Sequence, residues 1–274
     1  MTGIYDDPWA YELACSFRDV PAEVDVLLRW TARHRAGAAG PGPALGGLDG
    51  GGVRDVLELA AGPAEHAREF ARRGVAATAL DLHPAMCAYA ARRAKEEGVG
   101  LDVVQEDMTA FALGRRFDLV VTMLDSTSHL MTLDAFTAHL DRAAEHLRPG
   151  GLYVVEMSHP RDRLSDDPSV STGWTVERGD VRATVRWGEP SDRLDPVTQV
   201  SDDHVTMTVS GGGAGGGTRV IRDVVPYRFW SATELAAAVR LSGSLEIVAQ
   251  YGDFADVPLS APDAWRMITV LTAR

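Results

Sequence analysis

VLELAAGPAEH, residues 56–66, is the stretch that decides the fold of this chain. An apolar strand runs through an acid, Glu58, and a turn of small residues around Gly62 leads into a helix. A second strand is expected over residues 75–81, and it ends on Asp81, 23 positions after Glu58. An acid at that place commonly binds the hydroxyl groups of a ribose. The stretch therefore predicts a nucleoside-binding β-α-β unit.

Strands and helices continue to alternate on the C-terminal side of this unit. The pattern predicts strands over residues 53–59, 75–81, 101–107, 117–124 and 151–157, and helices over 63–73, 84–97 and 132–147. Helices of 10–15 residues between strands are typical of right-handed β-α-β units in a doubly wound parallel sheet. The fold class expected from this alternation is α/β.

The alternation stops after Met157. Residues 170–229 hold four β-branched runs with alternating polar residues, which predict antiparallel strands, and the glycine run 211–217 predicts a hairpin tip. Ser231-x-x-Glu234 is a capping box that starts another helix. Two more strands are expected at 244–251 and 265–273, and the last of them could pair antiparallel with the sheet.

The chain before the first strand has a different character. Apolar residues at helical spacing predict helices within residues 4–35, and the Gly/Pro/Ala run 36–52 has no periodicity and predicts a linker. The expected organisation is a helical N-terminal lid, a linker, a core and a β insertion. Their bounds are 1–35 for the lid, 36–52 for the linker, 53–157 with 230–274 for the core, and 158–229 for the insertion.

Composition narrows the function classes. The 274 residues carry a formal charge of −12, which does not suit nucleic acid or an anionic membrane surface. No apolar run is long enough to span a membrane and no signal peptide is evident, while two cysteines fit a reducing cytoplasm. Lys95 is the only lysine and follows no glycine loop, so a P-loop and Schiff-base chemistry are not expected.

The turn after the first strand indicates which nucleoside fits. A dinucleotide site needs G-x-G-x-x-G so that backbone amides can approach a pyrophosphate, and only Gly62 of that set is present. The acid Glu58 would also repel a pyrophosphate. S-adenosylmethionine has no phosphate, and its ammonium and sulfonium groups are cations, so the turn favours S-adenosylmethionine.

Five motifs in order resemble those of the class I S-adenosylmethionine-dependent methyltransferases. They are ELAAGPA at 58–64, ALDLHPAM around Asp81, EDM at 106–108, FDLVVTMLDSTSHL at 117–130 and LRPGGLYVVE at 147–156. The resemblance covers roughly residues 53–157. It implies a Rossmann-like, seven-stranded methyltransferase sheet and the cofactor S-adenosyl-L-methionine, with S-adenosyl-L-homocysteine as product.

A finer resemblance is to glycine N-methyltransferase-like enzymes and antibiotic amino-sugar N-methyltransferases. Those enzymes share a helical lid with tyrosines, a Ser/Gly-His-Leu after the fourth strand and antiparallel strands after the fifth, and Ser128-His129-Leu130 matches the second feature. The resemblance implies natural-product methylation at an amine nitrogen of a small-molecule acceptor. It does not identify the acceptor, and it makes a homodimer one expectation.

The candidate site residues follow from these matches. His129 is the candidate acid–base residue because it follows the fourth strand at the edge where ligands bind and titrates near neutrality; packing into the next helix is the alternative. The cofactor-binding candidates are Tyr11, Glu58, Ala60, Gly62, Asp81, Leu82, Met86, Asp107, Met108, Leu124 and Asp125. The substrate-binding candidates are Tyr5, Glu156, His159, Tyr227 and Arg228.

Several of these residues have a structural alternative. Tyr227 and Arg228 could belong to an amphipathic strand, Arg18 could be solvated rather than bind a carboxylate, and Trp9 and Phe17 are expected to pack on the core. The remaining histidines are not at metal-ligand spacing, so no metal is expected.

Four functions stay open at this point. The first is methyl transfer to an amine of a small molecule, and the near alternative is methyl transfer to oxygen. The third is a protein that binds S-adenosylmethionine without catalysis. The fourth is a nicotinamide-dependent oxidoreductase, which the missing glycines disfavour.

Overall fold

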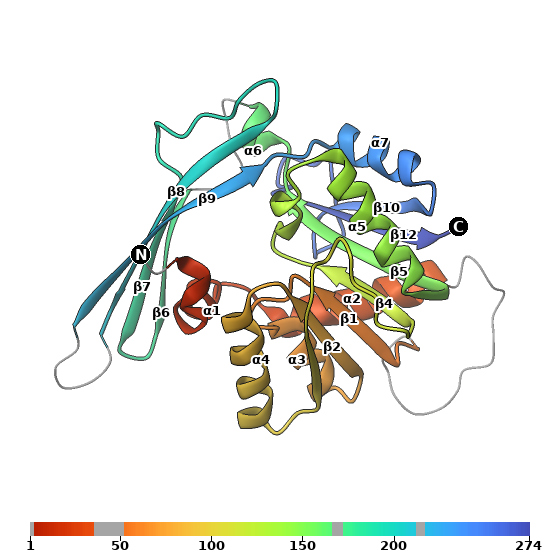
Figure 1. Ribbon diagram of the computed structural model, residues 1–274, viewed down its shortest axis with the longest axis horizontal. Helices are drawn as coiled ribbons and strands as arrows, with labels where there is room; N and C mark the ends of the chain where they lie inside the picture. Colours follow the sequence, from red (N-terminus) through yellow and green to blue (C-terminus); the bar gives the residue numbers. More distant parts are fainter. Residues whose placement is uncertain (1–2, 36–51, 166–171, 212–216) are drawn as a thin grey trace.

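The computed structural model describes residues 3–35, 52–165, 172–211 and 217–274. A central sheet of eight strands has the order β11-β10-β12-β5-β4-β1-β2-β3 (Figure 1). Its strands are β1 Asp55–Leu59, β2 Ala76–Asp81, β3 Leu101–Gln105, β4 Phe117–Thr122, β5 Leu147–Ser158, β10 Leu245–Asp253, β11 Val257–Pro258 and β12 Arg266–Ala273.

The pairing confirms the doubly wound α/β fold. Strands β1 to β5 are parallel, while β12 pairs antiparallel with both β5 and β10. The sheet has one strand more than the seven expected, because the two-residue β11 pairs with the end of β10. A strand of two residues is too short to produce a recognisable pattern in the sequence.

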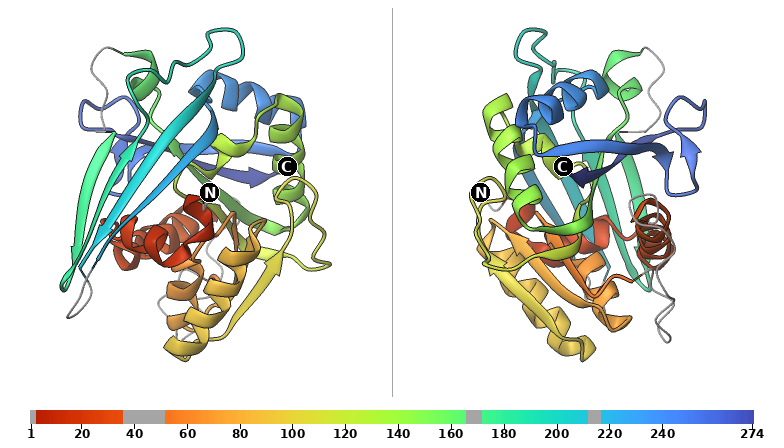
Figure 2. Two further views of the ribbon diagram at one scale, coloured as in Figure 1. Left: turned by 60° about the vertical axis from the view of Figure 1, so that its left-hand side comes forward. Right: turned by 90° about the vertical axis from the view of Figure 1, so that its right-hand side faces the viewer.

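Helices cover both faces of this sheet (Figures 1 and 2). One apolar cluster joins the sheet to α2, α3 and α4, and a second joins it to α5 and α7. Alternation along β4 shows why: Leu119 and Val121 belong to the first cluster and Val120 to the second. The helices are α2 Val20–Arg35, α3 Glu65–Arg72, α4 Pro84–Glu97, α5 Leu133–Glu145 and α7 Ala232–Ser242.

Two predicted helix boundaries were wrong. Helix α3 begins at Glu65 rather than at residue 63, because Ala64 before it has a left-handed backbone, with a φ of 59°. Helix α5 ends at Glu145 rather than at residue 147. The chain enters β5 at Leu147, and its pairing with β4 shifts register before Leu152, so the following Pro-Gly pair lies inside the strand.

A second, antiparallel sheet lies beside the central one (Figure 2). Its order is β6-β7-β8-β9, and β8 and β9 pair from Val200↔Arg228 to Ser210↔Thr218, which confirms the hairpin. Residues 212–216 of the predicted tip, and residues 36–51 of the predicted linker, lie outside the described residues. The strands are β6 Gly173–Arg178, β7 Val181–Trp187, β8 Val200–Ser210 and β9 Thr218–Arg228.

The N-terminal segment packs on this second sheet. The short helix η1 Ile4–Asp6 and helix α1 Pro8–Ala14 place Ile4 and Leu13 in one apolar cluster with Val185 and Met207. The expectation that Trp9 and Phe17 pack on the core was wrong, because these rings remain 41% and 48% exposed. None of the helices in the described segments is long and apolar enough to cross a membrane.

Candidate functional site

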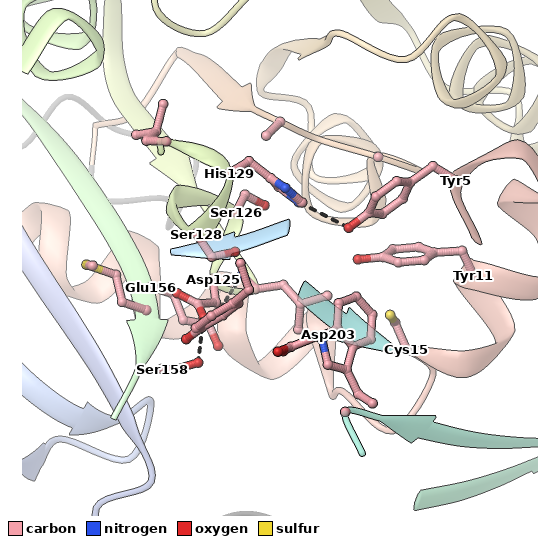
Figure 3. A pocket seen from close by; sticks show the side chains of 18 of the residues that line it. Tyr5, Tyr11, Cys15, Asp125, Ser126, Ser128, His129, Glu156, Ser158 and Asp203 are labelled. Carbon is pink, nitrogen blue, oxygen red and sulfur yellow. Dashed lines mark hydrogen bonds between the residues drawn. The ribbon is translucent and has the colours of Figure 1, made fainter. Parts of the chain in front are cut away.

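A cavity of about 1390 Å³ lies between the carboxyl edge of the central sheet, the N-terminal segment and the second sheet (Figure 3). The turn after β1, the ends of β2 and β5, and the segment after β4 contribute to its wall. Ligands of open α/β sheets bind at this edge. Within the described part of the chain, no group of three or more histidine, cysteine or acidic side chains is placed to hold a metal ion.

The turn after β1 approaches the cavity through its backbone. Ala60, Gly62 and Ala64 all have positive φ angles, of 51°, 53° and 59°. A Cβ added at Gly62 would lie 3.9 Å from the ring of Tyr11, which is an ordinary contact, so the positive φ rather than lack of space favours glycine here. Small residues form this part of the wall.

Asp81 connects the turn to the end of β2. One carboxylate oxygen accepts the Gly62 amide at 2.7 Å, and the other accepts the His83 amide at 2.8 Å. Burial raises the pKa of Asp81 despite these two bonds. The carboxylate is thus held rigidly at the cavity wall, with lone pairs left for a further donor.

Glu58 does not lie in the cavity wall. Its side chain is buried and accepts the Ala67 amide of α3 at 2.8 Å, while His66 Nδ1 lies 3.5 Å from the other oxygen. Glu58 is therefore not placed for a direct contact with the cofactor amine, and a contact through water stays a prediction. In this structure Glu58 fastens α3 to β1.

A buried ion network lies beneath the cavity. The Arg18 guanidinium binds Glu23 at 2.6 Å and Glu156 at 2.8 Å, and Arg266 binds the same two acids at 2.9 and 3.2 Å. Burial opposes the charged form of His66, but hydrogen bonds to Glu23 and Glu58 outweigh it and raise the pKa of His66 to about 9. Arg18 is therefore a buried structural residue and not a solvated one.

The segment after β4 brings an acid to the floor of the cavity. Leu124 and Asp125 have φ angles of 53° and 56°, and the Leu124 amide donates to Glu156 at 2.9 Å. Asp125 accepts the Ser158 hydroxyl at 2.5 Å and the Tyr227 hydroxyl at 3.0 Å. Burial raises the pKa of Asp125 to about 6, although the hydrogen bonds from these donors lower it.

His129 ends the short helix η2 Ser126–His129 and points toward the lid (Figure 3). Its Nε2 lies 3.0 Å from the Tyr5 hydroxyl, and the two rings meet nearly edge-on. Tyr11 lies beside Tyr5, with 5.5 Å between ring centroids. Burial lowers the pKa of His129, so its imidazole is neutral near pH 7 and can accept a proton.

Comparison with known proteins decides the family. A family model described as a methyltransferase domain matches residues 56–151. The dTDP-3-amino-3,4,6-trideoxy-α-D-glucopyranose N,N-dimethyltransferase of Streptomyces venezuelae is 30% identical over 191 residues, which are 69% of this chain and 74% of that enzyme. The chain belongs to the S-adenosylmethionine-dependent methyltransferases.

Solved structures of other methyltransferases share the fold. A Clostridium acetobutylicum S-adenosylmethionine-dependent methyltransferase superposes with a TM-score of 0.72 at 14% identity, covering 95% of this chain and 94% of that one. DesVI of Streptomyces venezuelae also gives 0.72, at 22% identity and 98% coverage of both chains. These likenesses extend over the N-terminal segment and the second sheet as well as the core.

Most of the residues expected at the site of this methyltransferase line this cavity. They are Tyr5, Tyr11, Ala60, Gly62, Asp81, Leu82, Met86, Asp107, Met108, Leu124, Asp125, His129, Glu156 and Tyr227. They come from segments as far apart as the lid and β9, and the fold brings them together.

Two substrate candidates are not in the wall, as Glu58 is not. His159 binds the Leu259 carbonyl at 3.0 Å and accepts the Arg161 amide at 3.1 Å, so it holds the start of helix α6 Arg161–Leu164. Arg228 binds Glu234 at 3.1 Å and lies over the ring of Trp230. Arg228 therefore has the structural role that the sequence left open, because its bond to Glu234 links β9 to α7.

The sequence did not reveal several wall residues of the methyltransferase. They are Cys15, Phe17, Ser128, Ser158, Arg163, Trp174, Trp187 and Asp203. The Trp174 indole donates to the Ala14 carbonyl at 2.8 Å, and its ring meets Phe17 edge-on. The available signal was Asp203, an acid at alternate spacing with the apolar Val205 and Met207, with which it shares the buried face of β8.

Proposed function

We propose that this enzyme transfers the methyl group of S-adenosylmethionine to the amine nitrogen of a small, sugar-like acceptor. The observation that supports this most directly is a cavity with Asp81, a carboxylate held by hydrogen bonds, on one wall and His129, a neutral histidine, on another. Three relatives support the acceptor class, because each is named as an N,N-dimethyltransferase of an amino sugar carried on dTDP.

The wall near β2 suits the nucleoside of the cofactor. Asp81 would accept the ribose hydroxyls, and the small turn at Ala60 and Gly62 allows close approach without offering cations to a pyrophosphate. The apolar side chains of Leu82, Met86 and Met108, with Asp107, would enclose the adenine, and Tyr11 and Leu124 would adjoin the amino-acid end. When bound, S-adenosylmethionine supplies an electrophilic methyl carbon on a sulfonium.

The chain's own part is to orient the amine and to remove a proton. An amine must present a free lone pair, so its ammonium form first loses a proton. Tyr5 fixes the ring of His129 through its 3.0 Å bond to Nε2, and the other ring nitrogen, Nδ1, accepts that proton. The nitrogen lone pair then forms the new N–C bond as the C–S bond breaks, and the lid excludes water.

A product analysis tests the proposal. The purified protein is incubated with methyl-labelled S-adenosylmethionine and an amino sugar, and the position of the labelled methyl group is read by NMR. We expect label on nitrogen, and calorimetry should show binding of S-adenosylmethionine but not of NAD or NADP. Label on oxygen, or binding of a nicotinamide instead, would contradict the proposal.

The organisation predicted from the sequence belongs to this proposal. The lid is assigned to residues 1–35, the core to 53–157 with 230–274, and the acceptor-side insertion to 158–229, with Tyr5, Glu156 and Tyr227 facing the acceptor. A cytoplasmic location is proposed because Cys15 and Cys87 are both free thiols. A homodimer stays a prediction.

A further inference from the structure

The cavity beyond its nucleoside wall is anionic, and we propose that it takes a cationic amine free of phosphate, with Asp125 binding the acceptor ammonium. The inference rests on the proposed function and narrows its substrate class. It separates this enzyme from the three named relatives, whose acceptors carry a diphosphate through dTDP.

The balance of charge in the cavity wall supports this. Besides Asp81, Glu106 and Asp107 at the nucleoside wall, six aspartates and glutamates line the cavity, but only three arginines do. Arg163 is bound to Asp203 at 2.9 Å, and Arg266 is bound to Glu23 and Glu156. Two of the three cations are thus already neutralised by buried acids.

Arg186 is the third arginine, and within the described ranges it has no acid at salt-bridge distance. Lys95, the only lysine, does not line the cavity. Residues 1–2, 36–51, 166–171 and 212–216 contain no lysine or arginine, so they can add no guanidinium or ammonium side chain. A diphosphate is normally bound by several guanidinium or ammonium groups, and this wall offers one.

Asp125 is an acid whose donors are all neutral. It accepts the Ser158 hydroxyl and amide and the Tyr227 hydroxyl, and no basic side chain of the described residues pairs with it. A carboxylate has about four lone-pair positions, so one remains for an ammonium. Its pKa of about 6 keeps it ionised at pH 7.5, where an unpaired charge in a protein favours a cationic partner.

Aromatic side chains of the cavity also suit a cation. Trp174 and Trp187 line it together with Tyr227, whose ring already lies against the Arg163 guanidinium, and aromatic faces attract ammonium groups. Asp125 and His129 lie four residues apart on the same segment and both face the cavity (Figure 3). The acceptor binds to Asp125 as an ammonium, gives one proton to His129, and attacks as the free amine.

Binding measurements with matched ligands test the inference. The full chain, saturated with S-adenosylhomocysteine, is titrated calorimetrically with three compounds. The first is dTDP-3-amino-3,6-dideoxy-α-D-glucopyranose, the acceptor named for a Streptomyces fradiae relative. The second is the methyl glycoside of the same amino sugar, and the third is that glycoside with hydroxyl in place of the amine.

We expect the amino glycoside to bind at least ten times more tightly than the dTDP sugar. Asp125→Asn should weaken the amino glycoside by about 10- to 100-fold and leave the hydroxyl analogue unchanged, because only the ammonium makes a charge-assisted bond. Asp202→Asn is the matched control. It removes the same charge from the exposed face of β8, outside the cavity wall, and should change neither affinity.

Tighter binding of the dTDP sugar would overturn the inference and leave the proposed function intact. Equal losses for amine and hydroxyl ligands in Asp125→Asn would also overturn it, since the residue would then act on folding or shape alone. Loss of S-adenosylhomocysteine binding in that variant would place Asp125 at the cofactor rather than at the acceptor, and would overturn it as well. If neither sugar binds to the loaded protein, both the sugar-like acceptor and the inference are wrong.

Discussion

Replacing Arg18 by methionine tests whether the buried ion network holds the lid to the core. Arg18 lies between α1 and α2, and its side chain is 3% exposed. Burial opposes its charge, yet Glu156 and Glu23 raise the pKa of the guanidinium above its usual value. Methionine fills a similar volume without the charge.

The expected loss follows from what remains around the two acids. Removing one partner of a buried ion pair costs about 3–5 kcal/mol, because the opposite charge is left unpaired. Arg266 stays at 3.2 Å from Glu156 and at 2.9 Å from Glu23, and His66 also stays at 2.9 Å from Glu23, so neither acid is left without a cation. We therefore expect the lower end, about 3 kcal/mol, which for a chain of this size lowers Tm by about 6–12 °C.

Urea denaturation followed by tryptophan fluorescence measures the change in the free energy of unfolding. Arg29→Met is the matched control, because the Arg29 bridge to Asp256 is 3.2 Å long but the arginine is 47% exposed. Such a surface pair contributes less than about 1 kcal/mol. If Arg18→Met loses no more stability than Arg29→Met, the network does not stabilise the contact between lid and core.

Four further variants test single groups. The pKa of His66 is about 9 in the folded protein, against an ordinary histidine value of 6.5. Its contribution to stability is therefore complete below about pH 6.5 and is lost as the pH rises through 9. His66→Gln should make the urea midpoint fall less over this pH range. Asp81→Asn should weaken calorimetric binding of S-adenosylmethionine by about 10- to 100-fold, because it removes the charged acceptor. Glu58→Gln should change that affinity less than about threefold, and an equal loss would restore Glu58 as a cofactor ligand. His129→Ala should lower kcat/KM by about 100-fold, and an unchanged profile across pH 6–9 would exclude it as the proton acceptor.

The core of the fold could be predicted because its signals are local. Helix α4 has the bounds that the sequence predicts, Pro84–Glu97, because proline starts it and Gly98 ends it with a left-handed φ of 69°. The Ser231 capping box forms as predicted, with the Ser231 hydroxyl accepting the Glu234 amide. Each of these features depends only on residues within a few positions of one another.

The roles of single side chains at strand ends were harder to predict, because they depend on which face a residue occupies. Glu58 lies between Leu57 and Leu59, which face α5 and α7, so it must face α3 on the opposite side. Tyr227 faces the cavity, and Arg228, one residue later, faces away from it. The spacing within a motif identifies the end of a strand. Which side chain reaches the ligand is decided by the alternation of side chains between the two faces of that strand.

The acceptor wall could not be predicted because it joins distant segments. The Ile4 amide donates to Asp223 at 2.9 Å, across 219 positions, and this contact docks the lid on β9. The family model matches only residues 56–151, whereas Trp174, Asp203 and Tyr227 of the acceptor wall lie beyond it. Similarity to known methyltransferases over the core therefore carries the nucleoside end of the cavity. The acceptor end is built by residues outside the matched family model, and the Clostridium and DesVI structures that cover them are at most 22% identical and show only the fold, so its specificity has to be measured on this chain.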